Sequence, residues 1–241
     1  MAFSEKSIEH RKFGRINIKK SPRASRISLS IRPFEPLRLT VPTLVSYKRA
    51  EEFLERKESW IRKNQEKIRK LEKSYTIFSE TSPFRTRDHE LEIHRSDAGE
   101  ARVIVQGGKI RVRLPLRAEI QDPAIQGIIR KGIELALRKE AKEHLPRRLG
   151  ELSRRHNLGF NRVIIKNNRT RWGSCSQQNN INLSLHLMRL PDHLIDYILV
   201  HELVHTVHKN HGKKFWAELE GLYPGARAAD RELKKFRMDI Y

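Results

Sequence analysis

Apolar and polar residues alternate along the first third of the chain in the way that is typical of short, half-buried strands. The period-two segments are GRINIKK (residues 14–20), SRISLSI (25–31) and LRLTVP (37–42), and prolines separate them. From Ser46 to about Lys73 the period becomes helical, and Ser46 is a suitable N-cap. The apolar stripe of this helix includes Phe53, Leu54, Trp60, Ile61, Ile68 and Leu71. The N-terminal third is therefore expected to be β followed by α.

The middle of the chain predicts a hairpin and then a long helix. HELEIH and ARVIVQGGKIRVRLP alternate again, and the Gly107-Gly108 pair between two runs predicts a tight turn, because glycine adopts positive φ without steric cost. Asp122 as N-cap and Pro123 at the first helical position begin a helical pattern that continues towards His156. Pro146 is expected to kink this helix or divide it in two.

The last third carries strand patterns at residues 161–166 and 180–186, a helix from Asp192 to about His208, and a final helix over Ala226–Met238. Together the patterns predict an α+β fold. A chain of this length accommodates one large domain or two small ones. We expect a basic, β-rich N-terminal region with a long helix over residues 1–120, and a domain of helices with a small sheet over residues 121–241.

The net charge adds an expectation about partners. The 241 residues contain 50 Lys and Arg against 29 Asp and Glu, a formal charge of +21. Residues 1–40 hold ten Lys and Arg against three Glu, whereas residues 192–222 hold three Lys against five acids. A positive field attracts polyanions. The charge is therefore interpreted either as a solvated basic surface or as a site for an anionic partner such as nucleic acid or a nucleotide.

Three features bear on the compartment. No stretch approaches the about 18 consecutive apolar residues of a membrane span, and the first residues lack the apolar region of a secretory signal. The single cysteine, Cys175, rules out an internal disulfide framework. We expect a soluble cytoplasmic protein without a membrane partner, and the sequence gives no sign of its oligomeric state.

The segment HELVHTVHKNH (residues 201–211) is the most specific indication of function in the sequence. Residues four apart on an α-helix lie about 40° apart around its axis, so His201 and His205 project from one face and can reach one ion. Glu202 is too far round to be a natural ligand, but it is placed to accept a proton from a water that the metal activates. Apolar residues occupy the opposite arc: Ile195, Leu199, Val200, Leu203, Val204 and Val207.

The third ligand is a choice among several residues. On an unbroken helix His208 would rise about 10 Å from His201, too far to close a tetrahedron. His211 converges if the chain turns back after about His208, and Asn210 and Gly212 both tolerate a left-handed turn. We favour His211, with His208 as a side chain at the helix C-terminus. A glutamate ligand, Glu218 or Glu220, remains open at this point.

Three ligands leave a fourth position for water, as in catalytic zinc sites. Zinc is the expected metal because imidazole suits it, and Mn, Co and Ni are the alternatives. Such an ion lowers the pKa of its water towards 7, and Glu202 would accept the proton and deliver it to the leaving group.

The segment RWGSC (residues 171–175) is interpreted in two ways. Arg171 is a candidate for stabilising an oxyanion or holding an anionic substrate. Trp172 and Cys175 are interpreted as packing residues. A nucleophilic Cys175–His186 pair is conceivable, although nothing in the sequence orients the histidine.

Several segments resemble the YgjP-like metallopeptidase family, formerly a domain of unknown function: RWGSC, INLSLHL, IDYILVHELVH and NHGKKFW, together with the N-terminal SPRASRISLSI and SWIRKNQ. The metal motif of that family is similar to those of the SprT and WLM zinc peptidases. The resemblance covers most of the chain, and Ser184 stands where the family often has Asn. It implies a zincin-like metallohydrolase in residues 121–241, with His201, His205 and His211 as ligands and Glu202 as the base.

These observations lead to three hypotheses. The first is a zinc-dependent hydrolase, most simply a peptidase acting on a protein or peptide. The second keeps the metal but replaces the substrate with a phosphate-containing molecule such as a nucleotide, because of the positive charge and Arg171. The third is a non-catalytic nucleic-acid-binding protein with a structural metal. Such a site needs four protein ligands, and only His208 or Cys175 could be the fourth. No DNA-reading motif is present, although DNA association also occurs in the SprT-type peptidases.

Overall fold

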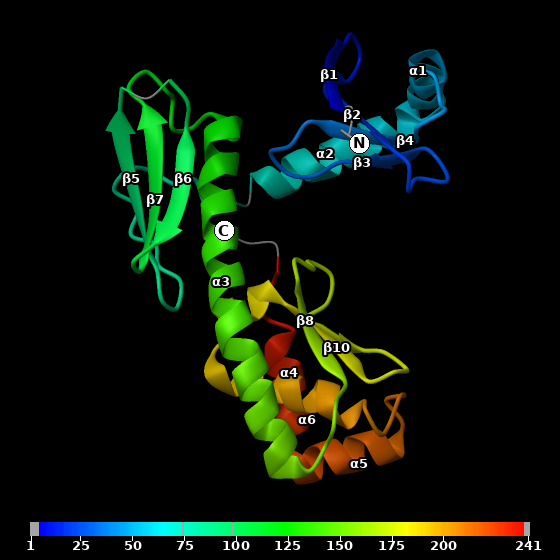
Figure 1. Ribbon diagram of the computed structural model, residues 1–241, viewed down its shortest axis with the longest axis vertical. Coiled ribbons are helices and arrows are strands. Elements are labelled where there is room, and N and C mark those ends of the chain that lie inside the picture. The colour runs from blue at the N-terminus through cyan, green and yellow to red at the C-terminus, as the bar shows by residue number, and fades with distance from the viewer. Residues whose placement is uncertain (1–4, 74, 98, 239–241) are drawn as a thin grey trace. The chain divides into compact units, whose positions relative to one another are not determined.

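The computed structural model describes residues 5–73, 75–97 and 99–238 of the chain (Figure 1). They form helices and three small mixed sheets, which confirms the expected α+β class. The chain divides into two compact units, residues 1–77 with 121–127, and residues 78–120 with 128–241. Residues 78–120 thus group with the C-terminal part, whereas the predicted division after residue 120 assigned them to the N-terminal part.

The first unit is a four-stranded sheet with two helices over one face. The strands β1 (Glu5–His10), β2 (Gly14–Ser21), β3 (Ser28–Ser30) and β4 (Leu37–Pro42) lie in the order β1-β2-β4-β3, with β2 parallel to β4. Burial alternates along β2 and β4 as predicted, because the apolar residues at every second position of these strands are buried. The core of this unit joins both layers: Phe13, Ile16, Ile18, Leu37, Leu39, Val41, Ala50, Leu54 and Ile61.

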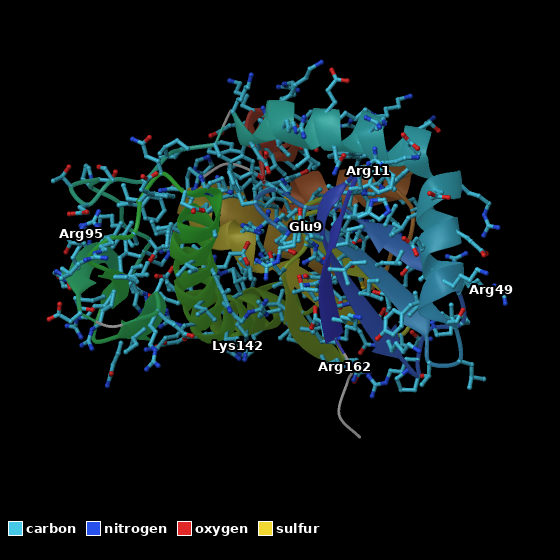
Figure 2. All side chains as sticks on the ribbon, turned by 90° about the horizontal axis from the view of Figure 1, so that it is seen from above. Glu9, Arg11, Arg49, Arg95, Lys142 and Arg162 are labelled. Atoms are coloured by element: carbon cyan, nitrogen blue, oxygen red, sulfur yellow. The ribbon has the colours of Figure 1, made fainter. Side chains whose placement is uncertain are left out.

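The helical stretch after Ser46 is two helices, α1 (Tyr47–Arg56) and α2 (Glu58–Glu72), instead of one. Ser46 is the N-cap, because its side chain accepts a hydrogen bond from the Arg49 amide at 3.3 Å. The break is at Lys57, whose φ of −101° and ψ of 12° are not helical. Cationic side chains such as Arg11 and Arg49 stand exposed on the surface of this unit (Figure 2).

The second unit contains a three-stranded sheet of β5 (Glu90–Ser96), β6 (Arg102–Gln106) and β7 (Lys109–Pro115), in the order β5-β7-β6. The predicted hairpin is present, with φ of +57° at Gly107 and +71° at Gly108. The helix α3 (Pro123–His156) starts at Pro123 as predicted, next to the Asp122 cap. It runs through Pro146 as one helix, so of the two effects expected of this proline the division is wrong, and the kink stays a prediction.

The remaining elements of this unit build the framework of the histidine motif. A second small sheet has the order β8-β10-β9, from β8 (Arg162–Lys166), β9 (Gly173–Cys175) and β10 (Asn180–Ser184). A 3-10 turn, η1 (Leu185–Arg189), leads to α4 (Asp192–Val204), and α5 (Lys213–Leu222) and α6 (Ala226–Leu233) follow. The last helix is shorter than the predicted Ala226–Met238. Within the described residues, no helix has the length and apolar content of a membrane span.

Candidate metal centre

The helix α4 carries His201, and most of its other side chains are buried and hold it in place. They are Leu194, Ile195, Tyr197, Ile198, Leu199, Val200, Glu202, Leu203 and Val204. The helix ends at Val204 with His205 as its C-cap, four residues before the predicted end near His208. Val207, assigned by its helical position to the apolar arc, therefore lies beyond the helix and is 57% exposed.

The three imidazoles of His201, His205 and His211 meet at one point. The Nε2 atom of His211 is 3.0 Å from that of His201 and 3.1 Å from that of His205. A tetrahedral ion with bonds of 2.0–2.1 Å separates its ligand atoms by about 3.3 Å, close to this spacing. His205 is buried, His201 partly buried and His211 exposed, so the cluster opens to solvent on one side. The donor set and its spacing fit a metal ion with one open position.

The chain reverses between His205 and His211 without a left-handed residue. The amides of Thr206 and His208 donate to the carbonyls of Leu203 and Val204 at 2.9 and 2.8 Å, which closes the end of α4. Positive φ angles at Asn210 or Gly212, which the sequence suggested, are not observed, and Gly212 has φ −74°.

A partly buried contact fixes this reversal to the neighbouring β9–β10 turn. The Lys209 ammonium donates to the Ser176 carbonyl at 2.9 Å and to Asn179 Oδ1 at 2.5 Å. Asn179 itself has φ +56° in that turn. Lys209 was not singled out from the sequence, because its role depends on a turn 30 residues away.

The other candidate ligands have different partners. His208 contacts Glu218, at 2.6 Å between Nε2 and Oε2. Glu220 accepts hydrogen bonds from the amides of Gly225 and Arg227. The backbone carbonyl of His208 lies 2.8 Å from Nδ1 of His205. Because a carbonyl only accepts, Nδ1 of His205 carries the proton and its Nε2 presents a lone pair to the cluster.

The ring of Phe215 forms the floor of the cluster. It is fully buried, and its centroid lies 4.9, 4.5 and 4.7 Å from those of His201, His205 and His211. Burial of His201, reinforced by the two other imidazoles, lowers its pKa to about 3. His201 is therefore neutral near pH 7, the form that donates a lone pair to a cation.

The carboxyl group of Glu202 is buried beside β9, and only 5% of the residue is exposed. Its Oε2 atom has no hydrogen-bond partner among the described residues. Burial raises the pKa of Glu202 to about 8, and the positive charge of Arg171 opposes that rise. A buried carboxyl oxygen without a partner costs stability, and such groups are typical of functional sites.

Gly173, inside the RWGSC segment, makes room for Glu202. A Cβ atom at this position would lie 2.4 Å from Oε1 of Glu202 and 2.8 Å from both Cδ and Cγ. This glycine was not predicted from the sequence, although its place between Trp172 and Ser174 in RWGSC was the available signal. No side chain other than hydrogen fits here while Glu202 keeps its position.

Replacing Gly173 with Ala is expected to displace the Glu202 carboxylate and to reduce kcat/KM by about 100-fold, the effect of a misplacement of roughly 1 Å at a reacting centre. Steady-state peptide hydrolysis and thermal unfolding would be measured together. Gly221→Ala is the matched control, because a Cβ at that position in α5 meets no atom within 4 Å. Equal activity of the two variants would show that the position of Glu202 does not matter.

The other residues of the RWGSC segment differ in their exposure and contacts. Arg171 is exposed and acts on Glu202 through its charge. The carbonyl of Trp172 accepts a hydrogen bond from the Ser184 amide at 2.8 Å, which pairs β9 with β10. Cys175 is half-buried, and burial raises the pKa of its thiol. His186, its conceivable partner, contacts Asn167 Oδ1 at 2.9 Å through Nε2. The raised pKa of Cys175 and the contact of His186 with Asn167 do not support a thiolate nucleophile.

Comparisons with known proteins place this geometry in a family. A family model described as a YgjP-like, metallopeptidase domain matches residues 25–236. No curated protein sequence matches the chain. The solved structure of the metallopeptidase zymogen of Pyrococcus abyssi abylysin is 25% identical over 38% of this chain and 94% of its own, with a TM-score of 0.35. The zymogen of Methanocaldococcus jannaschii jannalysin is 26% identical over 39% of this chain and 94% of its own, with a TM-score of 0.34.

The family model spans most of the chain, including both small sheets of the C-terminal unit and the histidine cluster. The match therefore covers far more of the sequence than the one short histidine motif. The chain belongs to the YgjP-like metallopeptidase family.

Proposed function

We propose that this protein is a zinc-dependent peptidase that hydrolyses an amide bond with Glu202 as its general base. One observation carries the proposal: three imidazole nitrogens converge at 3.0–3.1 Å, and the residue after His201 on the same helix, Glu202, has a buried carboxyl oxygen without a partner among the described residues. His201, His205 and His211 would hold the ion. Zinc there would polarise the substrate carbonyl and acidify a water molecule.

Glu202 has the properties that a general base needs. Burial raises the pKa of Glu202, whereas the positive charges of Arg171 and of an ion held by the three histidines would oppose that rise and favour the carboxylate that accepts a proton. In the proposed reaction its carboxylate takes a proton from the attacking water and gives it to the leaving nitrogen. Arg171 supports the ionised form of Glu202, and we assign its guanidinium to the developing negative charge on the substrate.

The residues around the three histidines favour a metal site with an open coordination position over a structural metal site with four protein ligands. A structural zinc site needs a fourth protein ligand. His208 is paired with Glu218, and the group of ligand atoms found within the described residues contains only the three histidines. The exposed His211 leaves access for a substrate. These observations support a hydrolase in preference to a nucleic-acid-binding protein with a structural metal.

The decisive experiment is to assay the zinc-loaded protein in parallel on a denatured protein, a peptide library and nucleoside triphosphates. We expect peptide-bond cleavage that a chelator abolishes and added zinc restores. Hydrolysis of the triphosphates without any peptide cleavage would replace the peptidase with the phosphate-substrate hypothesis. Binding to DNA without hydrolysis of any substrate would favour the non-catalytic hypothesis.

A further inference from the structure

A stacked arginine stands beside the histidine cluster. The guanidinium carbon of Arg227, on α6, lies 3.9 Å from the ring centroid of Trp216, on α5. The Trp216 ring in turn lies 6.4 Å from the ring of His211. The guanidinium is therefore no more than about 10 Å from the His211 ring, which corresponds to roughly three residues of extended peptide. Figure 1 shows α5 and α6 close to α4 in this unit.

The charge of Arg227 is not neutralised by the acids around it. The residue is exposed, and no ion pair with a carboxylate is found for it within the described part of the chain. Glu220 accepts from backbone amides, including that of Arg227 itself at 3.4 Å. Asp230 pairs with Lys234 at 2.8 Å, and Glu232 with His193 at 3.1 Å. The carboxylates of Glu220, Asp230 and Glu232 thus have other partners.

The guanidinium of Arg227 is held over the indole ring of Trp216. A guanidinium that contacts an indole through a cation–π interaction still has N–H donors, and these match the two oxygens of a carboxylate. Stacking restricts the side chain before any ligand binds, so little further entropy is lost on binding.

We propose that Arg227, held on the face of Trp216, binds a carboxylate of the peptide substrate within about three residues of the scissile bond. The inference rests on the proposed peptidase function and names the substrate class for it: peptides that carry an acidic side chain or a free C-terminal carboxylate at that distance. Arg227 is thus a specificity-determining residue of the site.

The test uses matched peptides and two readouts. One pair differs by Glu or Gln near the scissile bond, and a second pair differs by a free or amidated C-terminus, so that the two sources of the carboxylate are told apart. We expect the wild-type protein to prefer one carboxylate form by about 10- to 100-fold in kcat/KM, the contribution of hydrogen bonds to a charged group. Arg227→Gln should abolish that preference, and Arg227→Lys should restore only part of it.

Arg231→Gln is the control for bulk charge, because it removes the same charge from an exposed position one turn along α6. This variant should keep the preference. Calorimetric binding of the same peptides to zinc-loaded Glu202→Gln is the second readout, since it requires no turnover. Equal or undetectable binding of the carboxylate and neutral peptides would overturn the assignment of Arg227. Carboxylate-selective binding without peptide hydrolysis by the wild-type protein would instead reject the peptidase function and retain the site.

Discussion

Glu202→Gln is expected to reduce kcat/KM by about 10²- to 10⁴-fold, the usual contribution of a general base, while the protein still binds one zinc ion. Glutamine has nearly the same shape but cannot accept a proton from water. The substitution also removes a buried acid whose Oε2 has no partner among the described residues, so unfolding should not become easier. A loss of activity in Glu202→Gln would therefore come from the missing base and not from unfolding of the protein.

The measurement combines steady-state hydrolysis, metal content and thermal unfolding. Glu218→Gln is the matched control, because it removes a carboxylate that lies outside the cluster and pairs with His208. Its activity should fall far less than that of the Glu202 variant. If Glu202→Gln retains full activity with its zinc, another group accepts the proton and the proposed mechanism is wrong.

His211→Ala should weaken zinc binding by more than about 100-fold, whereas His208→Ala should change it little. Loss of a residue that only orients a ligand costs 10- to 100-fold in metal affinity, and loss of a ligand costs more. The two histidines are three residues apart in the sequence, but only His211 places Nε2 within 3.1 Å of the other two ring nitrogens. The His208 carbonyl that orients His205 belongs to the backbone and survives the substitution.

Zinc affinity would be measured by competition with a chromophoric chelator. The visible spectrum of the cobalt-substituted protein would report the coordination geometry, which should change in His211→Ala and persist in His208→Ala. Equal weakening in both variants, or a change confined to the His208 variant, would show that the third ligand is misassigned.

Local periodicity predicted the elements whose side chains have one buried face. The β2 and β4 patterns alternate with the pleat, and Gly107-Gly108 forms the expected turn, since these features depend on neighbours only a few residues away. The end of α4 could not be predicted in this way. Its pattern continues to Val207, but hydrogen bonds to the carbonyls of Leu203 and Val204 close the helix where the chain must return towards the cluster.

The sequence alone determined which residues pair on one helical turn, His201 with His205, because a spacing of four places both on one face whatever surrounds the helix. Long-range packing decided the remainder: the return of His211, the anchor of Lys209 on the β9–β10 turn, the Phe215 floor and the room that Gly173 leaves for Glu202. These contacts join residues that are 4 to 33 positions apart in the chain. Their geometry therefore depends on how sheets and helices pack, which no local pattern encodes.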